Sequence, residues 1–147
     1  MDAIKRAANK LKDKITKSPL ERDLAESMNN ENWGAPNTLL HSIADRSYNP
    51  DDAAVIMKCI WENTKSHAKE WRKIYKTLVL LDIILKYGST RCVQEIRDET
   101  FKIRLLLDFS YMDSGQERGN GIREKSREII DMISDYKRLE EEREKAR

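Results

Sequence analysis

The longest apolar run of the chain lies between Trp71 and Gly88, with the sequence WRKIYKTLVLLDIILKYG. At about 100° per residue, one broad face of a helix here collects most of the large apolar side chains. These are Trp71, Ile74, Tyr75, Leu78, Leu81 and Leu85, with Val79 and Leu80 widening the face. A helix that is apolar over so much of its circumference is typical of the interior of a bundle. The pattern predicts that this segment is the central helix of the fold.

The beginning of the same segment is basic. Lys69, Arg72, Lys73 and Lys76 are spaced i, i+3, i+4 and i+7, so they share one narrow stripe opposite the core. They also lie near a predicted helix N-terminus, where backbone N–H groups favour an anion. The stripe therefore predicts a surface that attracts an anionic ligand.

Residues 3–17 are predicted to form an amphipathic helix. Its apolar stripe consists of Ile4, Ala7, Ala8, Leu11 and Ile15. Basic side chains flank the stripe, Lys5 and Lys12 on one side and Arg6, Lys10, Lys14 and Lys17 on the other. This pattern is typical of a helix that lies in a membrane interface. A surface helix packed on the bundle and a partner-binding helix are the alternatives.

The rest of the first half predicts three further helices. Ser18-Pro19-Leu20-Glu21 is a capping box that begins a helix ending near residue 28. Residues 29–36 form a break whose tryptophan, Trp33, is expected in the core. A short helix follows over 38–45, and Asn49-Pro50-Asp51-Asp52 begins the next one.

After the central helix the pattern predicts four more helices. Gly88 is expected to end the central helix in a left-handed conformation, and Ser89 to begin a helix over 90–98. A helix over 100–109 should bury Phe101, Leu105 and Leu106. Residues 110–121 are expected to form a loop, Asn120 to cap the next helix, and the last helix to end in a solvated charged run over 140–147.

Composition supports one all-helical domain. Charged residues make up 37% of the 147 residues, and glycine and proline are few. The net charge is +2, but residues 1–17 and residues 58–76 each carry six basic and two acidic groups. This segregation predicts an anionic partner for one surface. Cys59 and Cys92 are single cysteines in apolar patterns, which predicts reduced thiols and a cytoplasmic chain. Asp82 interrupts the longest uncharged stretch, so no membrane span is predicted.

No pattern in the sequence indicates catalysis. His41 and His67 have no neighbours at metal-ligand spacing, and nucleophile and phosphate-loop motifs are missing. The protein is therefore expected to have no cofactor, no metal and no enzymatic activity. It is also expected to be a monomer. Nucleic acid is not expected as a partner, because all three tryptophans fit core positions.

Several motifs resemble the epsin N-terminal homology (ENTH) domain in order and spacing. They are Asn30–Pro36 (NENWGAP), Ile43-Ala44-Asp45 with Tyr48-Asn49, Ile60-Trp61, Trp71-Arg72 with Tyr75-Lys76, Gly88-Ser89 with Arg91, Asp108-Phe109 with Tyr111-Met112-Asp113, and Arg123-Glu124-Lys125. The resemblance covers nearly the whole chain. It implies an all-α, right-handed superhelix of seven to eight helices over residues 18–147, preceded by the amphipathic helix of residues 1–17.

The resemblance also implies binding to phosphoinositide membranes, with a 4,5-bisphosphate or 4-phosphate headgroup. In such domains the leading helix folds over the headgroup and inserts its apolar face, here Ile4, Leu11 and Ile15. The headgroup side chains carried over are Lys5, Arg6, Lys10, Lys12, Asn30, Lys69, Arg72, Lys73 and Lys76. Lys73 replaces a histidine, and Ala25 and Asn63 stand where arginines are expected, so the lipid preference stays open.

The family acts in clathrin-mediated traffic, at the plasma membrane or at the trans-Golgi network and endosomes. This implies a cytoplasmic, peripheral membrane protein on clathrin-coated vesicles, with clathrin and adaptor complexes bound through a tail outside this chain. A competing hypothesis follows from the two missing arginines. The superhelix would then recognise a protein partner, such as a SNARE, with weak or no lipid specificity.

Overall fold

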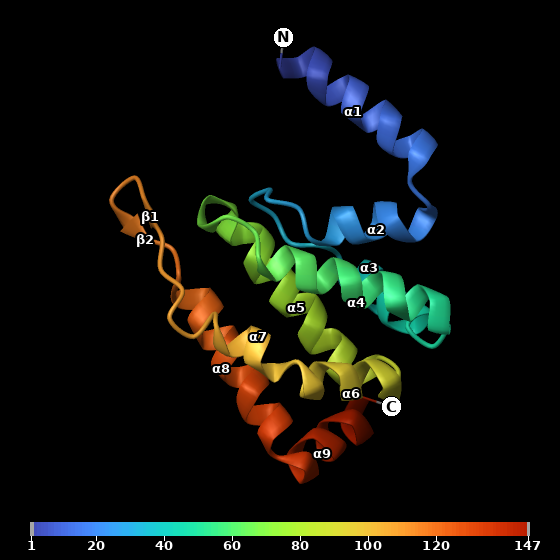
Figure 1. The fold of residues 1–147 in the computed structure, drawn as a ribbon, viewed down its shortest axis with the longest axis vertical. Helices are drawn as coiled ribbons and strands as arrows, with labels where there is room; N and C mark the ends of the chain where they lie inside the picture. Colours follow the sequence, from blue (N-terminus) through green and yellow to red (C-terminus); the bar gives the residue numbers. More distant parts are fainter. Residues whose placement is uncertain (1, 147) are drawn as a thin grey trace.

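The structure, a computed structural model, describes residues 2–146, apart from the side chains of residues 10 and 12–16. Over these residues the chain is almost entirely helical (Figure 1). The elements are α1 (Asp2–Thr16), α2 (Pro19–Ser27), α3 (Asn37–Arg46), α4 (Pro50–Thr64), the 3₁₀-helix η1 (Ala68–Glu70), α5 (Trp71–Tyr87), α6 (Thr90–Asp98), α7 (Thr100–Arg104), β1 (Met112–Asp113), β2 (Gln116–Glu117), α8 (Asn120–Ser134) and α9 (Tyr136–Ala146). The prediction of an all-α fold is confirmed.

Three helices begin at the caps that the sequence predicts. At α2 the Ser18 Oγ accepts from the Glu21 N–H at 3.2 Å, and the Glu21 carboxylate accepts from the Ser18 N–H at 3.4 Å. The Asn49 side chain accepts from the first N–H groups of α4, and Ser89 does the same for α6. Each cap satisfies N–H groups that have no partner within the helix.

α5 is the central helix, as its apolar pattern predicts. It contacts α2, α3, α4, α6, α8 and α9, and in Figure 1 it lies between the layers that these helices form. Its inner residues are fully buried, namely Leu78, Leu80, Leu81, Ile84 and Leu85. Burial of one such side chain stabilises the fold by roughly 1.5–3 kcal/mol, so this helix supplies much of the core.

The C-terminal end of α5 is held by α9. Arg143, predicted to be solvated, is buried and donates to the Leu85 carbonyl at 2.6 Å and to the Gly88 carbonyl at 2.8 Å. These carbonyls lack partners within α5, so the guanidinium satisfies them. The prediction for Gly88 was also wrong, because its φ is −79°. Glycine is needed there because a Cβ would lie 2.6 Å from the Ile84 carbonyl oxygen.

Several apolar side chains predicted to be buried are exposed. Trp33 is 63% exposed in the loop between α2 and α3, and Tyr75 is 39% exposed on α5. Phe101 and Leu105 are 58% and 77% exposed. Leu105 was misplaced because α7 ends at Arg104, so the predicted helical period does not continue to residue 109. Phe101 lies within α7, but Ile103 is the residue that this short helix buries.

The predicted loop over 110–121 contains a small hairpin. Strands β1 and β2 pair antiparallel, and the turn uses Ser114 and Gly115 at positive φ. Glu117 ties the hairpin to α8, accepting from the Arg123 guanidinium at 2.8 Å and from the Gly119 N–H at 2.9 Å. Asn120 is the first residue of α8, whose N-cap position is occupied by Gly119, so the predicted Asn120 cap was wrong.

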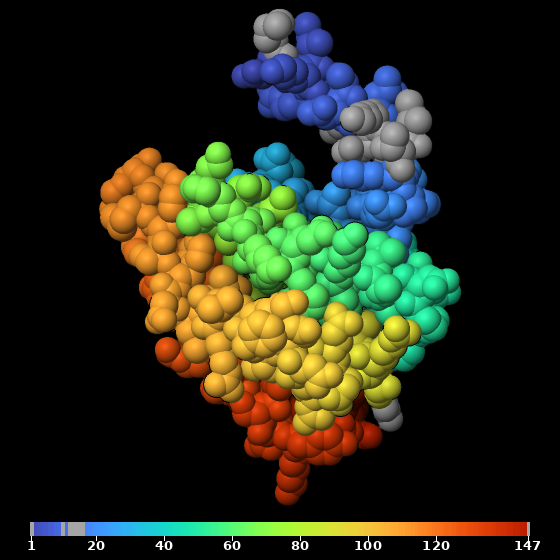
Figure 2. Space-filling model, in the orientation of Figure 1, coloured from blue at the N-terminus to red at the C-terminus, as the bar shows by residue number. Residues whose placement is uncertain are grey.

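α1 extends away from the rest of the bundle, and α2 lies between them (Figure 1). Figure 2 shows the same separation in the space-filling view. None of the helices within residues 2–146 is long and apolar enough to cross a bilayer.

Candidate functional site

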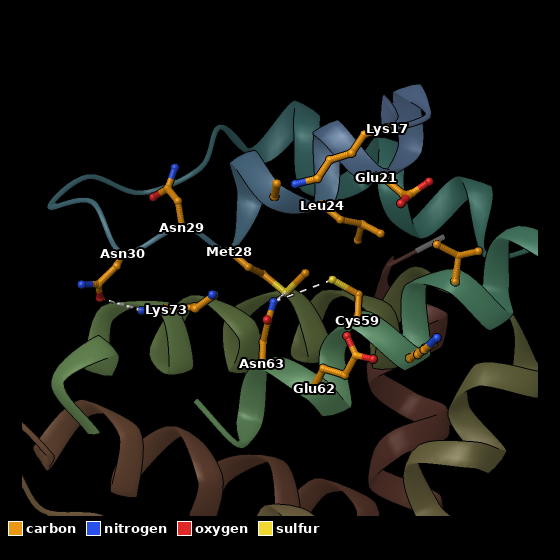
Figure 3. A pocket seen from close by; sticks show the side chains of 13 residues that line it. Lys17, Glu21, Leu24, Met28, Asn29, Asn30, Cys59, Glu62, Asn63 and Lys73 are labelled. Carbon is orange, nitrogen blue, oxygen red and sulfur yellow. Dashed lines mark hydrogen bonds between the residues drawn. The ribbon is translucent and has the colours of Figure 1, made fainter. Parts of the chain in front are cut away.

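A cavity of about 630 Å³ opens between α2 and α4, and the beginning of α5 closes one end of it (Figure 3). Its wall is formed by side chains from all three helices, from the loop after α2 and from the link between α1 and α2. They are Lys17, Glu21, Leu24, Ala25, Met28, Asn29, Asn30, Val55, Lys58, Cys59, Glu62, Asn63 and Lys73. The volume lies within the range of pockets that hold small ligands.

The wall of this cavity is divided between charged and apolar groups. Lys17, Lys58 and Lys73 contribute three positive charges, against two negative charges from Glu21 and Glu62. The net charge of the lining is therefore +3 − 2 = +1. A modest positive charge of this kind favours an anionic ligand over a cation.

The apolar part of the wall lies deeper. Leu24 and Met28 belong to the buried core, and the Cys59 thiol beside them is half-buried. Burial raises the pKa of the Cys59 thiol, so it stays protonated and unreactive at neutral pH. Asn63 makes only long contacts here, to the Met28 sulfur at 3.4 Å and to the Cys59 sulfur at 3.8 Å (Figure 3).

Asn30 and Lys73 close the cavity at the beginning of α5. The Asn30 side-chain oxygen accepts from the Lys73 backbone N–H at 3.4 Å, which joins the loop after α2 to the first turn of α5 (Figure 3). The Lys73 ammonium forms an ion pair with Glu70 at 3.4 Å. Both partners are partly exposed, so this pair is weak and its ammonium can exchange partners.

Lys76 has a different role. Its ammonium donates to the Asn29 side chain and to the Glu31 carbonyl, each at 2.6 Å, and so fixes the loop after α2. Burial lowers the pKa of Lys76, the Glu31 carboxylate opposes that change, and Arg72 adds to it. Lys76 therefore holds the loop that carries Asn30.

The predicted basic stripe is divided between two cavities. Lys73 lines the large cavity, whereas Arg72 and Lys76 line a second one of about 230 Å³ that also contains Trp33. Lys69 lies in η1, is exposed, and lines neither cavity. The loop after α2 separates the two groups, which helical spacing alone could not reveal.

The predicted insertion side chains of α1 are accessible where they are described. Ile4 and Leu11 are 70% and 61% exposed, and Lys5 and Arg6 are exposed as well. The predictions for Lys10, Lys12 and Ile15 concern side chains outside the described part of the structure. Among the described residues no group of three or more histidine, cysteine or acidic side chains could hold a metal ion.

Comparison with known proteins gives the family. The sequence model of the ENTH domain matches residues 17–139. The chain belongs to the ENTH domain family. It is similar to human epsin-2, with 38% identity over 130 residues, and to the clathrin interactor EPSIN 2 of Arabidopsis thaliana, with 36% identity over 145 residues. These alignments cover 88% and 97% of this chain, but only 20% and 16% of the two relatives.

The fold of this ENTH domain is also that of solved relatives. The ENTH domain of epsin-2 in complex with phosphatidylinositol 4,5-bisphosphate superimposes with a TM-score of 0.87 at 28% identity, covering 90% of this chain and 94% of that one. The predicted superhelical fold is thereby confirmed. The chain spans about a fifth of the length of the curated relatives it matches first.

The large cavity of this ENTH domain also contains residues that sequence reasoning missed. Lys17, Lys58, Glu21 and Glu62 were not assigned to the site. Lys17 and Lys58 do belong to the two basic segments, but they line the same cavity only because α2 packs on α4. Ala25 and Asn63 both line this cavity, so the two missing arginines would have pointed into one space.

Proposed function

We propose that this ENTH domain binds the phosphorylated headgroup of a phosphoinositide in the large cavity. The observation that supports this most directly is that one cavity is lined by Lys17, Lys58 and Lys73 together with Asn30. Ammonium groups form charge-assisted hydrogen bonds to phosphate that are about twice as strong as neutral ones. The beginning of α5 adds the positive end of its helix dipole, which favours an anion.

The headgroup selectivity of this cavity is proposed to be low. Ala25 and Asn63 provide no cation, and Glu21 and Glu62 offset two of the three lysines. Additional phosphates on the inositol ring therefore find few additional donors. We expect a 4-phosphate and a 4,5-bisphosphate to bind with affinities that differ by less than about tenfold, or 1.4 kcal/mol.

α1 supplies the second part of the proposed membrane contact. Its basic side chains, Lys5, Arg6, Lys10 and Lys12, would meet the anionic surface while Ile4, Leu11 and Ile15 enter the interface. α1 ends at Thr16, next to Lys17 in the wall of the cavity. A headgroup in the cavity would therefore lie close to the point where α1 joins the bundle.

The proposed cellular role is that of a non-enzymatic adaptor module. We infer that the domain acts at the cytoplasmic side of membranes in clathrin-mediated vesicle traffic, at the plasma membrane or at the trans-Golgi network and endosomes. The similarity to a protein named clathrin interactor and to a domain solved with phosphatidylinositol 4,5-bisphosphate supports this role. Binding of clathrin and adaptor complexes is assigned to sequence outside this chain.

The test is calorimetric titration of the domain with soluble inositol 1,4,5-trisphosphate, which removes general attraction to a bilayer. The double change Lys58→Glu, Lys73→Glu should abolish measurable binding. Its matched control is Lys137→Glu, Arg138→Glu, which changes the net charge equally on exposed residues of α9. Control binding should stay within about twofold of wild type, because distant exposed charges are screened by salt.

Two results would contradict the proposal. Equal losses in both double variants would mean that a diffuse positive field, and not the cavity, attracts the ligand. Wild-type protein that binds no inositol phosphate would favour the alternative module that recognises a SNARE or another protein partner.

A further inference from the structure

A second, smaller cleft lies on the other side of the loop after α2. Trp71 and Tyr75 form a ridge between two hollows of about 230 Å³ and 180 Å³. Trp33 and Arg72 line the first hollow, and Arg118 lines the second. We call this surface the aromatic cleft. Trp33 is 63% exposed within the cleft, although tryptophan side chains in folded proteins are usually buried to a large extent.

The two arginines of the aromatic cleft are held by the same indole ring. The Arg72 guanidinium carbon lies 4.4 Å from the centre of the Trp71 ring, and that of Arg118 lies 5.3 Å from it. Within the described residues, the Nε atom of each is shielded from solvent and has no hydrogen-bond partner. Arg118 has only a loose ion pair, 3.7 Å from the Asp113 carboxylate. The stacking orients both guanidinium groups, and both residues line the hollows that a ligand would enter.

Charge and shape define what this cleft can hold. Its lining carries Arg72, Lys76 and Arg118 against the single carboxylate of Glu31. Stacked guanidinium groups present a fixed fork that suits a carboxylate better than it suits a diffuse anionic surface. Gly121 leaves the second hollow open, because a Cβ there would lie 3.3 Å from the Tyr75 ring. The hollows on both sides of the ridge fit apolar side chains.

We propose that the aromatic cleft binds an extended acidic segment of a partner protein. An aspartate or glutamate of that segment contacts Arg72 and Arg118, and a neighbouring apolar side chain enters a hollow beside Trp71. Trp, Tyr and Arg are the residues that dominate binding energy at protein interfaces, and this cleft combines all three. The site is separate from the large cavity, so a headgroup and a peptide could be bound at the same time.

The test uses the full 147-residue chain, labelled with ¹⁵N, and an acetylated heptapeptide probe of sequence EDEFDED. The probe should shift the indole N–H signals of Trp33 and Trp71 in NMR spectra. Arg118→Gln should weaken binding by about tenfold or more, because a hydrogen bond to a charged group is lost. Arg118→Lys, which keeps the charge and loses the fork, should weaken it less than Arg118→Gln.

The matched control is Arg104→Gln, which removes one exposed arginine from α7 outside the cleft. It should leave the affinity for the peptide unchanged. No shift of either indole at millimolar probe overturns the proposal, and so does equal weakening by Arg104→Gln. The proposal is also overturned if Arg118→Gln reduces binding to anionic vesicles but leaves binding of the peptide unchanged.

Discussion

Restoring two arginines to the large cavity should convert this domain into a tighter and more selective headgroup binder. Ala25 is exposed at the rim and has room for a longer side chain. Asn63 is partly buried, and its contacts to two sulfur atoms at 3.4 and 3.8 Å are weak. The double change Ala25→Arg, Asn63→Arg therefore sacrifices little stability.

The expected gain follows from the charge of the lining. Three lysines and two glutamates give +1, and two arginines raise this to +3. A hydrogen bond to a charged group contributes about 1.5–3 kcal/mol where it is protected, and solvent screening at the rim reduces that. With about 1 kcal/mol retained per arginine, affinity for inositol 1,4,5-trisphosphate should rise by roughly 30-fold.

Calorimetry on wild type and the double variant measures this gain. Selectivity for the bisphosphate over the monophosphate headgroup should increase together with affinity, because each added guanidinium group binds a phosphate group of the ligand. The control Gln94→Arg, Gln116→Arg adds the same charge at exposed positions on α6 and β2 and should change affinity by less than about threefold. If the cavity variant binds no tighter than this control, the reasoning that assigns the headgroup to this cavity is refuted.

Three further changes test other parts of the molecule. Leu11→Glu should reduce flotation with phosphoinositide vesicles by tenfold or more, since a buried leucine contributes about 1.5–3 kcal/mol, whereas Asn9→Glu should not. Arg143→Met should lower the free energy of unfolding in urea by about 1–3 kcal/mol, because the Leu85 carbonyl loses its donor, whereas the Gly88 carbonyl still accepts from the Tyr48 hydroxyl at 3.1 Å. Glu117, whose pKa the Arg123 guanidinium lowers to about 2, should titrate in NMR near that value. In Arg123→Gln the pKa of Glu117 should return towards 4.5. On acidification the Glu117 carboxylate of this variant is then protonated at a higher pH than in wild type, and its contact with the Gly119 N–H weakens there.

The elements of this fold were largely predictable from the sequence, because their signals are local. Ser18, Asn49 and Ser89 begin helices through contacts within three residues of themselves. The apolar period of residues 71–87 defines the central helix without reference to its neighbours. Where the local signal was weak, as after Arg104 and around the hairpin of residues 112–117, the prediction was wrong.

The candidate sites depend on contacts that no local pattern contains. Lys17 and Lys58 are far apart in the chain and line one cavity only because α2 packs against α4. Arg72 and Lys73 are neighbours in sequence, yet they line different cavities, because the loop after α2 separates the two cavities.

Chain periodicity therefore determined which residues form helices and which faces are apolar. Only tertiary packing decided which charges converge, because a cavity is built from side chains of several elements at once. Trp33 illustrates the difference. Its aromatic character predicted a place in the core, but the core consists of side chains from the helices, and the Trp33 indole lies in an open cleft.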